Sequence, residues 1–281
     1  MKNNKDIQDI ESAVKKYYEL NYKGVSNSKM GLELALRTHL NEDDANMHLE
    51  LVKDYISLKD KTILDVGSGF GCFLKAALEK GYNVFGAEVD DLMWQTSRKR
   101  LALEGFDEEV IKKSEIDTLP YEDGLFDVVT FFNVLEHVDN IQALLAESQR
   151  VLKKDGQLFI WGPNYLCLYE PHYEMYLIPV LPKAIAKLYL RMRGKKTEFL
   201  DTLNFAKPWY LERVMNKLDM KIDNVGLKEW KSDLKTLNSK YRTSAGTNVL
   251  KLIKKMHLSN IAAFLGNLGF YYPLKYIATK K

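Results

Sequence analysis

The sequence predicts an α/β protein built on a doubly wound, mostly parallel sheet. From Lys61 onward, short apolar runs alternate with amphipathic stretches of helical length, which is typical of successive strand–helix–strand units. The apolar runs are also nearly continuous, as expected for strands that are buried on both faces.

The N-terminal part of the chain is predicted to be helical. Residues 41–58 start with Asn and Asp and then place Leu49, Val52 and Ile56 at mostly helical spacing. We therefore expect residues 1–60 to form a helical segment that precedes the sheet.

The core, residues 61–164, is predicted to alternate strands with helices. Strands are expected at residues 62–67, 83–89, 110–114, 126–135 and 157–163, and helices at 72–81, 92–105 and 140–156. Gly81, Gly105 and Gly156 are interpreted as the ends of these three helices, because glycine readily adopts the left-handed backbone that often ends a helix.

The alternation stops after residue 164. Residues 165–207 are aromatic-rich and basic and are predicted to form an inserted helical cap, in which Ile185, Leu188 and Leu190 face inward if the basic side chains are simply solvated.

Residues 208–281 are predicted to complete the core. We expect a helix at 207–220 with a proline in its first turn, a strand at 221–227 and a closing strand at 274–281. The amphipathic, basic stretch 248–270 is expected to pack against the sheet domain, with contact to an anionic membrane as the alternative.

Composition is that of an ordinary soluble globular protein, with 46% hydrophobic and 28% charged residues. No apolar run is long enough to span a membrane, and the first residues lack an apolar signal core. The two cysteines, Cys72 and Cys167, follow no metal or redox spacing, which favours a reducing cytoplasm.

Charge is distributed unevenly along the chain. Residues 1–164 carry 20 Lys and Arg against 29 Asp and Glu, whereas residues 228–281 carry 11 against 2. A basic C-terminal part on an acidic body indicates either an anionic substrate or surface, or a solvated lysine-rich face.

A glycine-rich turn between the first strand and the next helix predicts a ligand site. Gly67, Gly69 and Gly71 have the spacing G-x-G-x-G, which differs from the dinucleotide fingerprint, and the Lys-Ser/Thr pair of a phosphate-binding loop is missing. Asp65 would repel a pyrophosphate, and Glu88 at the end of the next strand can accept hydrogen bonds from both hydroxyls of a ribose. Together these residues predict a nucleoside that carries a cationic amino acid.

Four segments in order, "LDVGSGFG", "GAEVD", "LPYEDGLFDVVTFFNVLEHV" and "RVLKKDGQLFIWGPN", resemble the motifs of class I S-adenosylmethionine-dependent methyltransferases. The chain is most similar to the branch that contains ubiquinone-biosynthesis O-methyltransferases and glycan-modifying enzymes of O-antigen and polysaccharide pathways. The resemblance implies a Rossmann-like sheet of seven strands and S-adenosylmethionine as cofactor. It covers residues 60–165 closely and residues 165–227 more loosely.

The resemblance also implies roles for individual cofactor-binding residues. Asp65 with the backbone of Gly67, Gly69 and Gly71 would surround the methionine part, and Glu88 would bind the ribose hydroxyls. The remaining assigned positions are Val89 against the adenine ring, Glu115 and the Ile116 backbone at the adenine edge, and Asn133 near the sulfonium. This chain has Glu at 88 and 115, where the family more often has Asp.

Two histidines are candidate catalytic bases, because an imidazole titrates near neutral pH. His137 follows the fourth strand of the core, and His172 lies at the start of the cap. Glu136 beside His137 could help to hold a divalent metal, as in some relatives, although the expected site has no metal. His39, His48 and His257 are interpreted as structural or exposed.

The cap is expected to recognise the methyl acceptor. Aromatic side chains could contact sugar rings or apolar ligands, and the candidates are Tyr165, Tyr169, Tyr173, Tyr176, Trp209 and Tyr210. The basic residues Lys183, Lys187, Arg191 and Arg193 recur at helical spacing and could meet the phosphates of a lipid-linked or nucleotide-linked glycan.

The resulting hypothesis is methyl transfer to an oxygen of a small molecule, foremost a sugar or glycan. A quinone-like or polyketide aromatic acceptor, activated by a metal, is the second hypothesis. A non-catalytic, cofactor-binding protein at the membrane periphery is the third. Nucleic acid is not expected as a partner, because the Asn/Asp-Pro-Pro-aromatic element of amino-methylating enzymes is replaced by "FNVLEH". The oligomeric state is left open.

Overall fold

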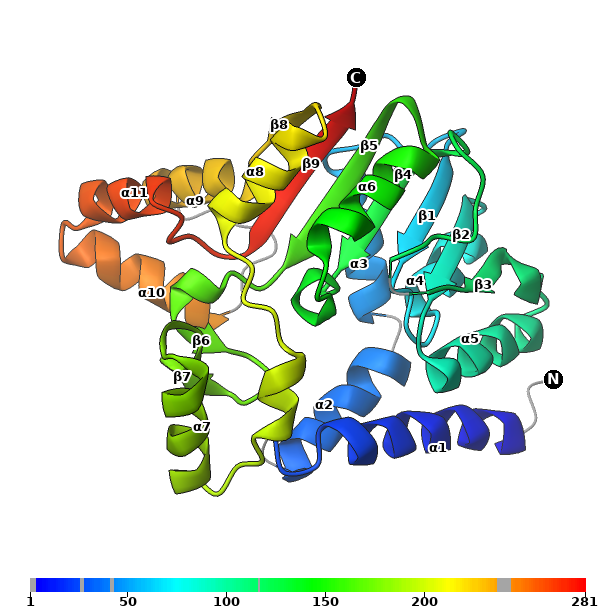
Figure 1. The fold of residues 1–281 in the computed structure, drawn as a ribbon, viewed down its shortest axis with the longest axis horizontal. Helices are drawn as coiled ribbons and strands as arrows, with labels where there is room; N and C mark the ends of the chain where they lie inside the picture. The colour runs from blue at the N-terminus through cyan, green and yellow to red at the C-terminus, as the bar shows by residue number, and fades with distance from the viewer. Residues whose placement is uncertain (1–3, 26–27, 41–42, 116, 237–243) are drawn as a thin grey trace.

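The computed structural model describes residues 4–25, 28–40, 43–115, 117–236 and 244–281. In this structure, a seven-stranded sheet runs through the centre of the molecule (Figure 1). Its strands are β1 (Thr62–Val66), β2 (Asn83–Glu88), β3 (Ile111–Lys113), β4 (Phe126–Phe132), β5 (Leu152–Gly162), β8 (Met220–Asp223) and β9 (Leu274–Lys280).

The strand order confirms the predicted fold class. The order is β3-β2-β1-β4-β5-β9-β8, in which β1 to β5 are parallel and β9 is antiparallel to both of its neighbours. The chain starts at β1 in the middle, winds outward to β3 and then crosses to β4 and β5. The carboxyl ends of β1, β2 and β4 therefore meet at one edge, next to the point where the direction of winding changes.

Helices cover both faces of the sheet. On one face, α6 (Ile141–Val151) and α8 (Pro208–Lys217) pack on apolar side chains of β4, β5 and β9. On the other face lie α3 (Asp43–Lys53), α4 (Cys72–Glu79), α5 (Asp91–Leu103) and the start of α9 (Val225–Thr236). In β5, Leu158 and Ile160 join the first core whereas Phe159 joins the second, because side chains alternate along a strand.

The N-terminal segment is helical, as predicted. It consists of α1 (Asn4–Asn21), α2 (Ser28–Leu40) and α3. The arrowheads of the parallel strands in Figure 1 point toward the side on which α1 and α2 lie. The N-terminal helices are thus placed over the edge of the sheet where ligands bind in this class of fold.

The prediction that a helix continues to Gly156 is wrong. Helix α6 ends at Val151, and β5 starts at Leu152, which pairs with Phe126. The register then shifts so that Gln157 pairs with Val128, and the residues between them bulge out of the strand. Gly156 lies in this bulge, and a side chain would not fit there because its Cβ would lie 2.9 Å from the carbonyl oxygen of Lys153. Gly81 and Gly105 do follow helix ends with positive φ, as expected.

The cap is not purely helical, contrary to the prediction. It contains a short hairpin of β6 (Tyr169–Glu170) and β7 (Met175–Tyr176), followed by α7 (Lys183–Met192). Ala186 and Leu190 of α7 are buried, but Ile185 and Leu188, which were expected to face inward, are exposed. The inward face is set by the small core around Tyr173 and Leu200, which α7 meets with its other side.

The C-terminal part differs from the prediction in two details. The strand expected at 221–227 is β8, which ends at Asp223, and α9 begins at Val225 because Asn224 caps it by accepting a hydrogen bond from the Leu227 N–H. The amphipathic stretch forms α10 (Ser244–Lys255) and α11 (Ser259–Asn267), which pack on α9 rather than on the sheet. No helix in the described ranges is long and apolar enough to cross a membrane.

Candidate functional site

The predicted cofactor residues lie together at the carboxyl edge of the sheet. Asp65 is buried near the end of β1, Glu88 is the buried last residue of β2, and the three glycines form the turn between β1 and α4. The N–H of Gly69 donates a hydrogen bond to Oε2 of Glu88 at 2.7 Å. Two neighbouring strand ends are thereby joined through the glycine turn.

All three glycines of the turn have the left-handed backbone that disfavours other residues, with φ of 68° at Gly67, 55° at Gly69 and 74° at Gly71. A Cβ at Gly67 would lie 2.7 Å from Val134, and a Cβ at Gly71 would lie 2.3 Å from the Ser97 hydroxyl. A Cβ at Gly69 would meet no atom within 4 Å. The turn therefore packs tightly against the protein on both sides and faces open space only in the middle, where a ligand can approach its backbone.

The carboxylates of the site favour a cationic ligand. Oδ1 of Asp65 accepts a hydrogen bond from the Thr130 hydroxyl at 2.7 Å, and Oε1 of Glu88 accepts one from the Asp90 N–H at 2.8 Å. Among the described residues, neither buried carboxylate is paired with a lysine or arginine. Burial raises the pKa of Asp65 to about 7, and the nearby charge of Glu88 adds to the effect. Burial likewise raises the pKa of Glu88. A cation bound here would favour the charged form of both carboxyl groups and lower their pKa values.

The other predicted cofactor residues are less firmly placed. Val89 follows β2 and is exposed, as a residue that contacts a ligand ring can be. Glu115 is exposed and forms an isolated bridge with Thr118, and Ile116 lies outside the described residues. Asn133 follows β4 with a φ of 54° and remains exposed at the same edge of the sheet. Their roles toward the adenine and the sulfonium stay predictions.

The N-terminal helix contributes an aromatic residue that the sequence did not reveal. The ring of Tyr17 on α1 packs edge-on against Phe70 of the glycine turn, with 5.7 Å between ring centroids. Burial raises the pKa of Tyr17, and the negative charges of Asp90 and Glu88 add to this shift. Tyr17 therefore lies close to the expected ribose position, although no motif around it indicates such a role.

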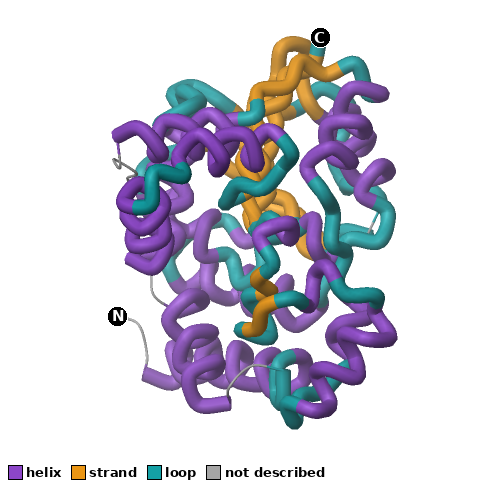
Figure 2. The backbone as a smooth tube through the Cα atoms, turned by 90° about the vertical axis from the view of Figure 1, so that its left-hand side faces the viewer, coloured by secondary structure: helices purple, strands orange, loops and turns teal. Residues whose placement is uncertain are grey.

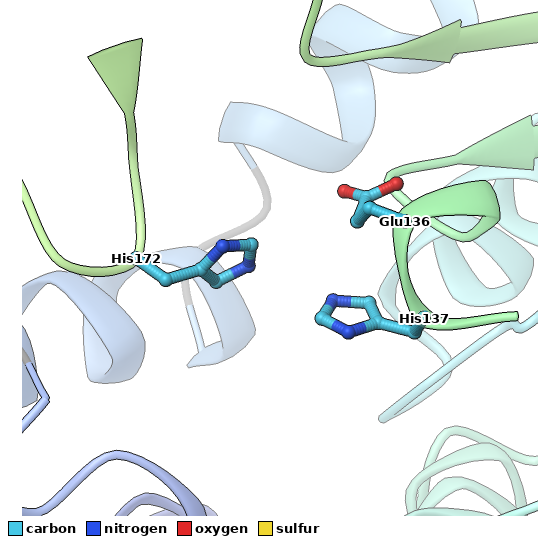
Figure 3. Close-up of side chains that lie close together, drawn as sticks. All are labelled: Glu136, His137 and His172. Carbon is cyan, nitrogen blue, oxygen red and sulfur yellow. The ribbon is translucent and has the colours of Figure 1, made fainter. Parts of the chain in front are cut away.

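The two candidate bases come together from distant parts of the chain. His137 follows β4, His172 lies in the hairpin of the cap, and their ring centroids are 5.2 Å apart. Figure 3 shows the two rings approaching one another from opposite segments, with Glu136 beside them. Tyr22 and Phe199 flank His172, with ring centroids at 6.0 and 5.2 Å. The aromatic neighbours restrict the ring to a narrow slot.

His172 is held by a buried carboxylate. Its Nδ1 lies 2.6 Å from Oε1 of Glu170, whose other oxygen accepts a hydrogen bond from the Tyr173 N–H at 2.6 Å. Burial lowers the pKa of His172, but the hydrogen bond to Glu170 and the charges of Glu170 and Glu136 raise it above its usual value overall. Sequence reasoning identified His172 but missed Glu170, although both belong to the segment "EPHYE".

Glu136 and His137 stand in different electrostatic surroundings. Burial raises the pKa of the Glu136 carboxyl to about 7. His137 is exposed as a residue, but burial of its ring lowers its pKa, and the positive charge of His172 adds to this shift. At neutral pH, His137 therefore offers a neutral imidazole next to His172.

Glu136, His137 and His172 could together hold a metal ion. One ligand atom from each lies within 4.8 Å of the others. Nitrogen and carboxylate ligands in this number suit a first-row divalent ion with open positions for a substrate. The same atoms can equally accept and donate protons without a metal.

The remaining predicted groups do not form one acceptor surface. Tyr165 and Tyr173 are buried in the core, whereas Tyr169 and Tyr176 are neighbours on the hairpin with ring centroids 5.0 Å apart. Trp209 is exposed on α8, as is the Tyr210 side chain. Of the cap cations, Lys187 forms a salt bridge with Asp201 at 2.7 Å, and Lys183 donates a hydrogen bond to the Asp201 carbonyl oxygen at 3.5 Å.

Three further histidines lie outside the candidate site. His39 packs against Phe70 and His48 against Phe132, and burial lowers the pKa of each histidine to about 4. His257 is exposed after α10. This agrees with the interpretation of these histidines as structural or exposed.

Comparison with known proteins bears on the central part of the chain. Residues 64–160 match the family described as "Methyltransferase domain". The ubiquinone biosynthesis O-methyltransferase of Dechloromonas aromatica is 29% identical over 167 residues, which cover 59% of this chain and 67% of that protein. The demethylmenaquinone methyltransferase of Tropheryma whipplei is 33% identical over 127 residues, which cover 45% of this chain and 52% of that protein. The chain thus spans between about half and two thirds of these relatives' lengths.

A solved structure was also found, that of geranyl diphosphate C-methyltransferase from Streptomyces coelicolor in complex with Mg2+, geranyl diphosphate and S-adenosyl-L-homocysteine. It aligns at 14% identity and a TM-score of 0.47 over 83% of this chain and 77% of that chain.

The sheet order and the glycine turn with its two carboxylates define a Rossmann-like domain that binds a nucleoside cofactor. Residues 64–160 are similar to a methyltransferase domain, which agrees with the class I methyltransferase fold and with S-adenosylmethionine as the cofactor. Asp65 and Glu88, which no lysine or arginine in the described ranges neutralises, and the open side of Gly69 fit this cofactor, which is cationic at its sulfur and carries a ribose.

Proposed function

We propose that this enzyme methylates a hydroxyl oxygen of a small, quinone-type phenol or enol, and that His172 is the base. The observation that carries the proposal is the pairing of the buried Glu170 carboxylate with the half-buried His172 ring. Because Glu170 occupies Nδ1 of the imidazole, the ring is fixed in one tautomer and Nε2 is left to accept a proton.

The cofactor, when bound, supplies an electrophilic methyl group on a sulfonium. The chain's own residues then have two tasks, which are to align the acceptor oxygen and to exclude water. Transfer of this methyl group to the acceptor oxygen would leave a neutral sulfide, which would keep the electron pair of the C–S bond. The hydroxyl proton passes to Nε2 of His172, and the positive charge gained by the imidazole is stabilised by Glu170 and Glu136.

The acceptor class rests on two lines of support. The relatives include an O-methyltransferase of ubiquinone biosynthesis and a methyltransferase of demethylmenaquinone, both named for quinone pathways. In addition, Tyr22 and Phe199 place aromatic side chains beside His172, and such surroundings suit a flat, apolar acceptor. A sugar or glycan acceptor, the first hypothesis from the sequence, stays a prediction without such support.

The test is to incubate the purified enzyme with S-adenosylmethionine and matched acceptors and to measure S-adenosylhomocysteine. A catechol that bears an apolar side chain should turn over, whereas a nucleotide-linked sugar should not. Turnover of the sugar in the absence of phenol turnover would contradict the proposed acceptor. His172→Ala should abolish phenol methylation but leave cofactor binding intact by calorimetry.

A metal-assisted variant is the second candidate, because one ligand atom from each of Glu136, His137 and His172 lies within 4.8 Å of the others. In that case these side chains would hold a divalent ion, and the ion would lower the pKa of the acceptor hydroxyl. Activity that is lost in a chelator and restored by Mg2+ or Zn2+ would favour it. Activity that persists in the chelator would favour His172 acting alone as the base.

A further inference from the structure

Helix α7 presents an apolar stripe to solvent instead of to the protein. Ile185, Leu188 and Met192 are exposed and recur at spacings of three and four residues, so they share one side of the helix. Ala186 and Leu190 anchor the opposite side in the cap core. The outward stripe therefore contributes nothing to the fold of the cap.

Helix α10 repeats this arrangement. Val249 and Leu252 of this helix and Met256 directly after it are exposed at the same spacing, whereas Leu250 is buried against α9. The large apolar side chains of both stripes are thus exposed to solvent, where they lower solubility and make no packing contacts.

Helix α11 carries the most apolar outer surface of the three. Ile261, Phe264, Leu265 and Leu268 follow the i, i+3, i+4, i+7 pattern of a single helix face, and Phe264 is 61% exposed. Its inner side is made of Ala262 and Gly266, which pack on α9. The helix itself, Ser259–Asn267, contains no charged residue.

These three helices lie along one side of the molecule. Figure 1 shows α7, α10 and α11 at its left-hand margin, and Figure 2 looks directly at that side. We call the outward stripes of the three helices the outer apolar face.

Basic residues outnumber acidic residues in the segments that carry the outer apolar face, although Lys187 is paired with Asp201. Residues 175–197 contain six Lys and Arg and no Asp or Glu, and residues 244–272 contain three Lys and no Asp or Glu. Apolar stripes with nearby lysines and arginines are typical of helices that lie in the headgroup region of an anionic membrane.

We propose that the outer apolar face docks on an anionic lipid bilayer. A second copy of the chain fits less well, because a symmetric interface would bring together two surfaces of the same positive sign. A bilayer instead offers a wide apolar layer under a negative surface and complements both features at once. This inference does not depend on the identity of the methyl acceptor.

The docked face would adjoin the candidate active site through the cap hairpin. Tyr169 and Glu170 are successive residues of β6, so their side chains point to opposite sides of the strand. Tyr169 is exposed, whereas Glu170 is buried beside His172.

Flotation of the full-length enzyme with vesicles tests the proposal. Vesicles that contain phosphatidylglycerol should carry the enzyme upward, pure phosphatidylcholine vesicles should carry much less, and added salt should release it. Phe264→Ser combined with Leu268→Ser should reduce the bound fraction about tenfold. Ile7→Ser with Leu20→Ser is the matched control, because it alters two exposed apolar residues of α1 and should change binding less than about twofold.

Three results would overturn the proposal. The first is a wild-type enzyme that stays at the bottom of the gradient with phosphatidylglycerol vesicles, and the second is an α11 double variant that floats as well as the α1 double variant. The third is a concentration-dependent dimer in sedimentation that the α11 substitutions dissociate, since the face would then be an interface between copies. Circular dichroism melts of both pairs should match the wild type, because all four side chains are exposed.

Discussion

Nδ1 of His172 lies 2.6 Å from a carboxylate oxygen of Glu170, two residues earlier in the chain, and Glu170 is completely buried. The short connection is possible because Glu170 ends strand β6 and the chain turns back at once toward β7. The second oxygen of Glu170 is fixed by the Tyr173 N–H. The Glu170 carboxylate is therefore held beside the imidazole through both of its oxygens.

The first prediction concerns the pH dependence of methyl transfer. The pKa of His172 lies above 6.5 in the folded enzyme, so the neutral, proton-accepting ring gains population as pH rises through that pKa, and kcat should rise with it. Glu170→Gln removes the charge that raises this pKa, while burial still lowers it. The acidic limb of the pH–rate profile should therefore move to lower pH, and kcat should fall about tenfold or more.

The stability of the same variant gives an independent check. A histidine with a raised pKa stabilises the folded chain below pH 6.5, and this contribution is lost as pH rises through the folded pKa. Glu170→Gln should accordingly be most destabilised, relative to the wild type, at acidic pH. An unshifted acidic limb would mean that His172 is not the titrating base.

The second prediction is proton release on cofactor binding. Burial raises the pKa of Asp65 to about 7, so below that pH the free enzyme carries a mostly protonated carboxyl. A cation bound beside it lowers this pKa, and binding should release up to about one proton near pH 6 and almost none above pH 8. Calorimetry in buffers of different ionisation heat measures the proton count.

Asp65→Asn supplies the control for this linkage. The variant should bind the cofactor about tenfold more weakly or worse and should release no proton from this site. Because the raised pKa means that the wild type loses stability as pH rises through about 7, the variant should melt at a higher temperature than the wild type in alkaline buffer. Equal proton release by both enzymes would assign the titration to another group.

The third prediction concerns the close packing of Gly71, in the glycine turn, against Ser97. Gly71→Ala places a methyl group 2.3 Å from the Ser97 hydroxyl at a φ of 74°, and we expect a loss of about 2–4 kcal/mol in unfolding free energy. Gly81→Ala has a similar φ of 76° but meets no atom within 4 Å, so it should cost only about 1 kcal/mol. Chemical denaturation compares the two variants.

The double variant Gly71→Ala with Ser97→Gly checks the cause. Removal of the serine side chain opens the space that the new methyl group needs, so part of the lost stability should return. Strictly additive losses in the double variant would show that the contact with Ser97 is not what limits this position.

The fourth prediction concerns α1 as part of the cofactor site. Tyr17→Ala removes the ring that packs on Phe70 and should weaken cofactor affinity about tenfold, whereas Tyr17→Phe should keep most of it. Leu20→Ala, on the same helix but largely exposed, is the control and should bind normally. Unchanged affinity of Tyr17→Ala in calorimetry would exclude α1 from the site.

The cofactor end of the molecule was largely predictable from the residues. The strand–turn–helix unit at 62–79 is determined by local sequence, because an apolar run, three glycines and a helical stretch follow one another directly in the chain. Glu88 was placed correctly because parallel strands end at the same edge of the sheet. The bulge at 153–156 was not foreseen, since it depends on how β5 pairs with β4 and not on its own composition.

The sequence by itself determined the sheet, the glycine turn and the carboxylate pair of Asp65 and Glu88, because these depend on periodicity and on residues that are close in the chain. Only the tertiary structure decided that His172 faces His137, that Tyr17 covers the turn, and that Ile185 and Leu188 point away from the protein. Those relationships join segments far apart in the sequence, or choose one of two apolar sides of a helix. These long-range contacts depend on which packing arrangement of the whole chain has the lowest free energy, and a local sequence pattern does not determine that.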